Sequence, residues 1–231
     1  MRRLAASLLA KLWASRLGKL LVLLLLLPYA LAAVYIVVPP ASTLMAWSWA
    51  SGQGASRRWV PIEHISPALV ATVITAEDSA FCSHWGVDTR QMIKSVEKAQ
   101  ARDKPVRATS TITQQVAKNL FLWQGRSWLR KGLELPLALW LELIWSKKRI
   151  AEVYLNVVEW GPGIFGAQAA ALAHFKTTAG DISYWQAALL ATSLPNPTLR
   201  DAGSPGPKQR EMARQLQHRA QKATPDLSCL R

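Results

Sequence analysis

The sequence predicts a mainly α-helical domain that follows a single N-terminal membrane-spanning helix. Apolar residues recur at helical spacing through most of the chain, strand signals are sparse, and one long uncharged run lies near the N-terminus. The chain has 231 residues and half of them are apolar. That length and composition suit one domain of ordinary size with an appendage, and they argue against disorder.

The N-terminal apolar run has the length of a membrane helix. Residues 20–38 carry no charge, and as a helix they would be roughly 28 Å long, close to the thickness of the bilayer core. All five basic residues of the first 38 precede this run, so the chain after Val38 is expected outside the cytoplasm. The sequence Ala30-Leu31-Ala32 also fits a cleaved signal peptide. The apolar run continues to Val38, however, and this favours an uncleaved anchor.

The remaining chain divides by composition into a connector and a helical domain. We predict a cytoplasmic N-terminus at 1–19, a transmembrane helix at 20–38, a juxtamembrane connector at 39–60 and a domain at 61–231. The connector is indicated by Pro39-Pro40 and the run SGQGAS. In the domain, Ser66-Pro67 is typical of a helix start. Apolar spacing then predicts helices over 111–121, 127–145, 148–158, 167–175, 183–193 and 208–222.

Charge and cysteine content narrow the function. The net charge is +14, and it is still +9 after the first 38 residues, so the outer surface should attract polyanions. A position outside the cytoplasm excludes nucleic acid and leaves anionic lipids or pyrophosphates. Cys82 and Cys229 show no zinc-like spacing. We expect two free thiols, with a single bridge between them as the alternative.

Two glutamates are candidates for chemistry. Glu77 shares a helical stripe with Val73 and Ile74, so desolvation should raise its pKa toward the range useful for a general base. Its alternative role is a cap or a salt bridge inside the fold. Glu134 follows Arg130 by four residues and Lys131 by three, and such an acid can orient cations, or share a metal, around a leaving phosphate. Ordinary ion pairs on a solvated helix face are the alternative.

The stretch TSTITQQVAKN groups uncharged hydrogen-bonding side chains with one cation. Gln115 and Lys118 share a helical face, and hydroxyls and amides suit sugar hydroxyls and N-acetyl groups. The ammonium of Lys118 suits a phosphate. Ser110 or Thr109 could also serve only as an N-cap.

Five motifs in order resemble the family 51 glycosyltransferases, which polymerise bacterial peptidoglycan, and in particular their monofunctional members. The resemblance covers about residues 60–200. Ala108 stands where the family has glycine, and Gln186 where it usually has an acid. The motifs are E-D-x-x-F-x-x-H-x-G at 77–86, S-T-I-T-Q-Q-x-x-K-N at 110–119, R-K-x-x-E at 130–134, K-x-x-I-x-E-x-Y-L-N at 147–156, and A-L-L-A with a later proline at 188–195.

The resemblance implies a lysozyme-like glycosyltransferase domain at 61–231 that acts on lipid II. The growing glycan would be the donor, and Glu77 would take the proton from the 4-hydroxyl of lipid II. Attack would invert the anomeric centre, form a β-1,4 link and release undecaprenyl pyrophosphate. Glu134 would be the second catalytic residue, with a divalent cation, Mg²⁺ or Mn²⁺, and no organic cofactor.

The family also implies roles for other residues and a location. The segment 91–107 would be a flap over the cleft, with a plain surface helix as the alternative. The protein would be a single-pass protein of the bacterial inner membrane with its catalytic domain in the periplasm, and cell-wall synthesis or division proteins would be partners.

The resemblance also implies residue roles. Asp78, Phe81 and His84 would shape the cleft. Substrate-binding residues would be Ser110, Gln114, Gln115, Lys118, Asn119, Arg126, Arg130 and Lys131.

Two rival functions are compatible with parts of this pattern. A murein-cleaving enzyme on a lysozyme-like fold would also use glutamates in a cleft, but it would not need Arg130-Lys131 beside the second acid. An inactive anchored scaffold of the cell-wall machinery would not need Glu77 and Glu134. We therefore expect a peptidoglycan glycan-strand polymerase.

Overall fold

The computed structural model describes residues 15–101, 103, 110–125, 127–222 and 225–231. The chain separates into two units, 1–38 and 39–231. Helix α2 (Arg16–Val34) belongs to the first unit and overlaps the predicted span of 20–38. It is long and apolar enough to cross a membrane, a property that signal sequences share. Its N-cap is Ser15, whose hydroxyl accepts a hydrogen bond from the Gly18 N–H at 2.9 Å.

The predicted connector contains regular structure that the sequence analysis does not anticipate. Helix α3 (Thr43–Ala50) begins after the N-cap Ser42 and packs against α6 (Ile112–Phe121). The Thr43 hydroxyl donates to the Leu122 carbonyl at 2.7 Å. Residues 43–50 are therefore part of the body of the outer unit.

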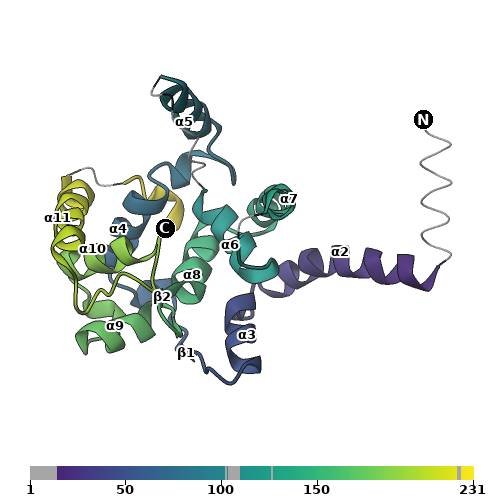
Figure 1. The fold of residues 1–231 in the computed structure, drawn as a ribbon, viewed down its shortest axis with the longest axis horizontal. Helices are drawn as coiled ribbons and strands as arrows, with labels where there is room; N and C mark the ends of the chain where they lie inside the picture. The colour runs from purple at the N-terminus through teal and green to yellow at the C-terminus, as the bar shows by residue number, and fades with distance from the viewer. Residues whose placement is uncertain (1–14, 102, 104–109, 126, 223–224) are drawn as a thin grey trace. The chain divides into compact units, whose positions relative to one another are not determined.

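Helix α4 (Pro67–Glu77) is largely buried in the outer unit and carries the first candidate residue at its last position (Figure 1). Ser66 caps it, as predicted, by accepting from the Ala68 N–H at 3.2 Å. Its side chains from Leu69 to Thr75 are buried. Helices α10 (Tyr184–Ser193) and α11 (Pro207–Lys222) pack on α4.

A second group of helices carries the second, third and fourth motifs. Helix α6 packs on both α7 (Trp128–Ile144) and α8 (Lys147–Val157). The N-cap of α6 is Thr111, so the alternative in which Ser110 serves only as the N-cap does not hold. The Thr111 hydroxyl accepts from the Gln114 N–H, and the Gln114 side chain accepts from the Thr111 N–H, which together form a capping box.

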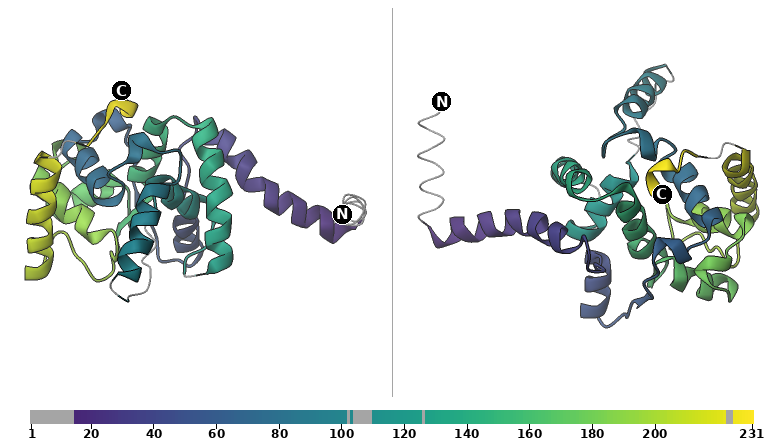
Figure 2. Two further views of the ribbon diagram at one scale, coloured as in Figure 1. Left: turned by 90° about the horizontal axis from the view of Figure 1, so that it is seen from above. Right: turned by 180° about the vertical axis from the view of Figure 1, so that it is seen from behind.

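A small sheet and the remaining helices complete the outer unit (Figures 1 and 2). Strand β3 (Ile164–Phe165) lies between β1 (Ser56–Arg57), which is parallel to it, and β2 (Glu159–Gly161), which is antiparallel. Helix α9 (Ala167–Phe175) follows, and short 3-10 helices cover Ile62–His64, Phe81–Ser83, Ala179–Asp181 and Ser228–Leu230.

The polar segment predicted as a flap, 91–107, overlaps helix α5 (Thr89–Gln100), which projects from the rest of the outer unit in Figure 1 and in the right-hand view of Figure 2. Asp88 caps it by accepting from the Gln91 N–H at 2.8 Å. Among its apolar side chains, Met92 and Ile93 are exposed. Residues 102 and 104–107 of the predicted flap lie outside the described residues, so its role stays a prediction.

The two cysteines form a disulfide, and the expectation of free thiols is wrong. Cys82 lies in the 3-10 helix Phe81–Ser83 and Cys229 in the 3-10 helix near the C-terminus, 147 positions later. The sequence could not show this pairing, because it depends on the chain returning to α4 after α11. The bridge ties the C-terminus to the loop that follows Glu77.

Candidate active site

The predicted catalytic residues meet in a cleft of about 560 Å³. The cleft lies where the end of α4 faces α6 and α7, beside the turn after α10. Arg126 lies outside the described residues, and Asn119 does not line the cleft. The lining residues are Glu77, Ser110, Gln114, Gln115, Lys118, Arg130, Lys131, Glu134, Leu194 and Pro195.

Asn119 is the one described substrate-binding candidate that the structure places elsewhere. It is 8% exposed, and its carbonyl accepts from the Thr43 hydroxyl at 3.2 Å. On a helix it projects about a quarter turn away from the face that Gln114, Gln115 and Lys118 share. It therefore belongs to the packing between α6 and α3.

Glu77 is a half-buried carboxyl held by an amide. Its Oε2 accepts a hydrogen bond from Gln115 Nε2 at 2.8 Å. Burial raises the pKa of Glu77, and Asp78 adds a smaller effect in the same direction. The Gln115 hydrogen bond and the charge of Lys118 oppose this rise. The direction agrees with the sequence expectation, and a carboxyl with a raised pKa suits proton abstraction.

Lys118 and Lys131 place two ammonium groups in the same cleft, and the partial burial of these charges costs free energy. Burial lowers the pKa of Lys118, and the nearby charge of Arg130 lowers it further, while Glu77 acts against both. Burial likewise lowers the pKa of Lys131, with Arg130 and Lys118 adding to the effect. Because these cations repel one another, an anion that entered the cleft would be stabilised by all three.

Glu134 is buried beneath this cationic cluster, which rules out a solvated helix face. Its side chain is 3% exposed, its Oε1 pairs with Arg130, and its Oε2 accepts from Lys131 Nζ at 2.8 Å. Lys131 Nζ also donates to the Ser110 hydroxyl at 2.8 Å. Glu134 thus holds the two cations of the R-K-x-x-E motif in place at the wall of the cleft.

The side chains of the cleft do not by themselves form a metal-binding site. Both oxygens of Glu134 are already paired with cations. Within the described ranges, no group of three or more His, Cys, Asp or Glu side chains could hold a metal ion. We therefore derive no step through a metal, and the predicted use of a divalent cation stays a prediction.

The three residues predicted to shape the cleft do not line it, and His84 lines a different pocket. Asp78 is buried and accepts from the Ile112 N–H at 2.9 Å and from His84 Nε2 at 2.9 Å. It therefore ties the end of α4 to the first turn of α6. Phe81 is buried, and Lys147 Nζ lies 4.5 Å from the centre of its ring.

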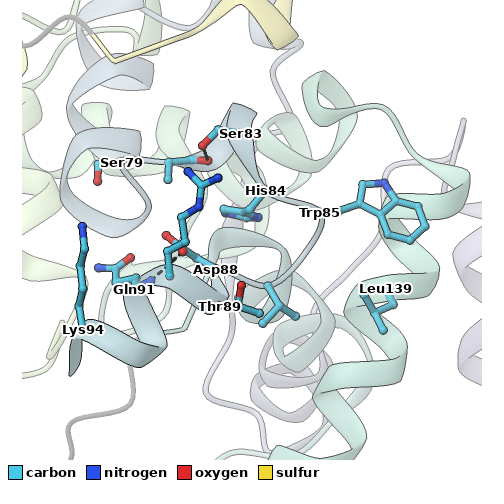
Figure 3. A pocket seen from close by; sticks show the side chains of 12 residues that line it. Ser79, Ser83, His84, Trp85, Asp88, Thr89, Gln91, Lys94 and Leu139 are labelled. Carbon is cyan, nitrogen blue, oxygen red and sulfur yellow. Dashed lines mark hydrogen bonds between the residues drawn. The ribbon is translucent and has the colours of Figure 1, made fainter. Parts of the chain in front are cut away.

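A larger pocket of about 730 Å³ lies beside α5 and contains neither candidate glutamate (Figure 3). Gln91 and Lys94 of α5 line one side of it, and Trp85 and Leu139 lie on the other (Figure 3). The functional carboxyls face the smaller cleft, so we assign the chemistry there.

Sequence reasoning missed three features around the glutamates. Tyr154, part of the fourth motif, contacts Gln115, although no role was predicted for it. Leu194 also lines the cleft, one residue before the proline of the fifth motif. Arg200 and Arg219 line a pocket of about 230 Å³ on another side of Glu77. Tyr154 and Pro195 stand in motifs, and this was the sequence signal available for the first two features. No sequence pattern pointed to Arg200 or Arg219.

Comparisons with known proteins agree with this site. A family model described as Transglycosylase matches residues 43–222. The chain is 51% identical to a biosynthetic peptidoglycan transglycosylase of Agrobacterium fabrum over 219 residues, which cover 94% of this chain and 96% of the relative. It is 49% identical to the protein of the same name from Brucella suis, over 95% of this chain and 100% of the relative. A third relative of that name, from Rhodopseudomonas palustris strain HaA2, is 50% identical over 88% of this chain and 90% of its own length.

Proposed function

Because the chain belongs to the transglycosylase family and is a peptidoglycan glycosyltransferase, we propose that it polymerises glycan strands by a single inverting displacement at Glu77. The acceptor is lipid II, and the donor is the growing glycan on its undecaprenyl pyrophosphate. The observation that supports this most directly is one cleft with a carboxyl of raised pKa at one side and three cations at another.

Glu77 acts as the general base in this proposal. Its Oε1 or Oε2 takes the proton of the 4-hydroxyl of lipid II as that oxygen bonds to the anomeric carbon of the donor. The bond from this carbon to the phosphate oxygen breaks, and the leaving pyrophosphate keeps the electron pair. Attack from the opposite face inverts the centre and gives a β-1,4 link.

The cationic cluster stabilises the leaving pyrophosphate. Lys118, Lys131 and Arg130 face the cleft, and Glu134 fixes the last two by its paired oxygens. Preorganised charges of this kind lower the barrier because they need no rearrangement as negative charge develops. A divalent cation, where one acts, would arrive on the pyrophosphate oxygens, since such ions are commonly bound through substrate phosphates.

A membrane substrate and an outward location are supported by features outside the cleft. Helix α2 has the properties of a membrane anchor. Leu135, Leu139 and Leu143 are exposed on the helix that carries Glu134, and exposed apolar surface of this kind suits an enzyme that acts on a lipid-linked substrate. The Cys82–Cys229 disulfide fits an oxidising compartment such as the periplasm. Contacts with cell-wall synthesis or division proteins belong to the same proposal.

Size separation of products from labelled lipid II tests the proposed function. The purified full chain in detergent should convert lipid II into a ladder of long glycans. Cleavage of finished peptidoglycan without a ladder would instead establish the murein-cleaving alternative. Absence of both activities, in the presence of a divalent cation, would contradict the proposal and favour the scaffold.

A further inference from the structure

Three side chains from three helices form a continuous hydrogen-bonded line that ends at Glu77. The Tyr154 hydroxyl of α8 donates to Gln115 Oε1 of α6 at 3.1 Å. Gln115 Nε2 in turn donates to Glu77 Oε2 at the end of α4 at 2.8 Å. Tyr154 is 1% exposed, and it does not line the cleft.

The direction of this line follows from the chemistry of its members. An ionised carboxylate can only accept, so Gln115 must turn its NH₂ group toward Glu77. Its carbonyl oxygen then faces Tyr154, and a hydroxyl that donates there stabilises this orientation of the amide. Burial raises the pKa of Tyr154 well above its ordinary value, and Glu77 and Asp78 raise it further. Tyr154 therefore keeps its proton and remains a donor.

We propose that Tyr154 is a positioning residue that holds the Gln115 amide in the orientation in which it donates to the base. This inference rests on the proposed role of Glu77. Without the hydroxyl, the carbonyl of Gln115 would lose its partner beside the buried ring. The amide could then rotate away from Glu77 or turn its oxygen toward the carboxylate, which repels it.

The consequence is a change in the proton affinity of Glu77. The Gln115 hydrogen bond stabilises the ionised carboxylate, so its loss should raise the pKa of Glu77. The other groups that act on Glu77 stay in place when only a hydroxyl is removed. Asp78 after α4 and Lys118 of α6 act on the pKa of Glu77 directly, and Arg130 of α7 acts on Lys118. Arg200 and Arg219, on the side of α10 and α11, line a pocket together with Glu77.

The test is Tyr154→Phe in the full chain, with the rate of lipid II polymerisation measured against pH. The acid limb of the pH–rate profile should move to higher pH, because a larger fraction of Glu77 is protonated at each pH on that limb. At the pH where the wild type runs at half its maximal rate, the variant should be about two- to tenfold slower, as expected for the loss of one hydrogen bond. At higher pH, where Glu77 is ionised in both, the rates should converge.

Two further variants separate positioning from stability. Gln115→Ala should shift the acid limb in the same direction, and Tyr154→Phe added to it should cause no further shift, because Tyr154 acts through Gln115. Thr75→Val is the matched control, since it removes a buried hydroxyl from α4 that donates to the Ala71 carbonyl at 2.8 Å within its own helix. It should leave the acid limb unchanged.

A direct titration distinguishes failure of this inference from failure of the proposed function. Carboxyl-carbon NMR of glutamate-labelled protein, with Glu77→Gln to assign the signal, should show a higher pKa of Glu77 in Tyr154→Phe. An unshifted titration, or a loss of rate that is equal at all pH values, would overturn the positioning role. If Glu77→Gln kept full polymerase activity, the proposed base would be wrong, and the titration would still decide whether Tyr154 sets its pKa.

Discussion

At Glu77 the fold holds a carboxyl where burial opposes its ionisation. Burial raises its pKa, so the folded chain binds this proton more tightly than the unfolded chain does. Stability from this group is therefore present at low pH and is lost as pH rises from the unfolded pKa through the raised folded pKa. Above that window the ionised Glu77 destabilises the fold, while it supplies the base that the reaction needs.

This linkage predicts that Glu77→Gln is more stable than the wild type at neutral and higher pH. The neutral amide removes the cost of a buried charge, so we expect the melting temperature to rise by roughly 2–4 °C. Below the ordinary pKa of a carboxyl, both side chains are neutral and the difference should vanish. Thermal unfolding of both proteins across this pH range measures it, and a variant less stable at neutral pH would contradict the linkage.

Lys131 supports the leaving group and also holds Glu134. Lys131→Ala should lower kcat/KM for lipid II by about 10- to 100-fold, because charged hydrogen bonds are worth about 1.5–3 kcal/mol. Stability should change little, since Arg130 still pairs with Glu134.

The matched control for Lys131 is Lys148→Ala. Lys148 pairs with Glu63 at 2.8 Å on the surface, away from the cleft. The Lys148→Ala variant should keep the wild-type kinetics, because exposed ion pairs contribute little to the stability of the fold. Equal kinetics in Lys131→Ala and Lys148→Ala would remove Lys131 from the site.

Among the elements, the turn at Gly86, the last residue of the first motif, contacts the start of the second motif at Thr111. Its backbone has a φ of +76°, and an added Cβ would lie 3.0 Å from Glu142 Cγ and 3.2 Å from the Ala138 carbonyl oxygen of α7. Its own carbonyl accepts from the Thr111 hydroxyl at 2.6 Å. Glycine is therefore needed here both for its backbone conformation and for the close approach of α7.

Gly86→Ala should destabilise the outer unit by about 2–4 kcal/mol, the sum of left-handed strain and crowding. Gly54→Ala is the matched control, with a φ of +72° and no atom within 4 Å of the added Cβ. It should cost only about 1 kcal/mol from strain. Chemical denaturation of both variants gives the difference, and equal losses would show that the contact with α7 carries no cost.

The long helices were predictable because their apolar spacing and caps are local properties of the sequence. Ser66 and Ser127 both cap helices at the predicted positions. Helix α3 was missed because Pro39-Pro40 and the glycine-rich run on either side mask an eight-residue helix whose stability comes from packing on α6.

Gln186, where the family usually has an acid, accepts from the Ser183 N–H in a capping box, a role that glutamate fills equally well.

Across the whole molecule, the Cys82–Cys229 bridge closes most of the outer unit into one covalent loop. It should stabilise the fold by about 2–4 kcal/mol, mainly by restricting the unfolded chain. A reductant should lower the melting temperature of the wild type. The variant Cys82→Ser/Cys229→Ser should melt at that lower temperature with or without reductant, and a wild type insensitive to reductant would contradict the stabilising role.

Linear motifs revealed most of the site, and tertiary packing decided the rest. Glu77, Lys118 and Glu134 could be picked out because each stands in a motif with an unusual helical neighbourhood. The contact of Tyr154 with Gln115 and the burial of Asn119 against α3 depend on how α8, α6 and α3 meet. No spacing rule within a single helix contains that information.

The most direct test of the account is the rate at which Glu77→Gln polymerises lipid II, measured at a pH where the wild type is fully active. Glutamine keeps the size of the side chain and can still accept from Gln115, but it cannot take a proton. The account predicts that glycan synthesis is lost while the thermal unfolding transition remains. Synthesis at a rate near that of the wild type would show that the base is another group.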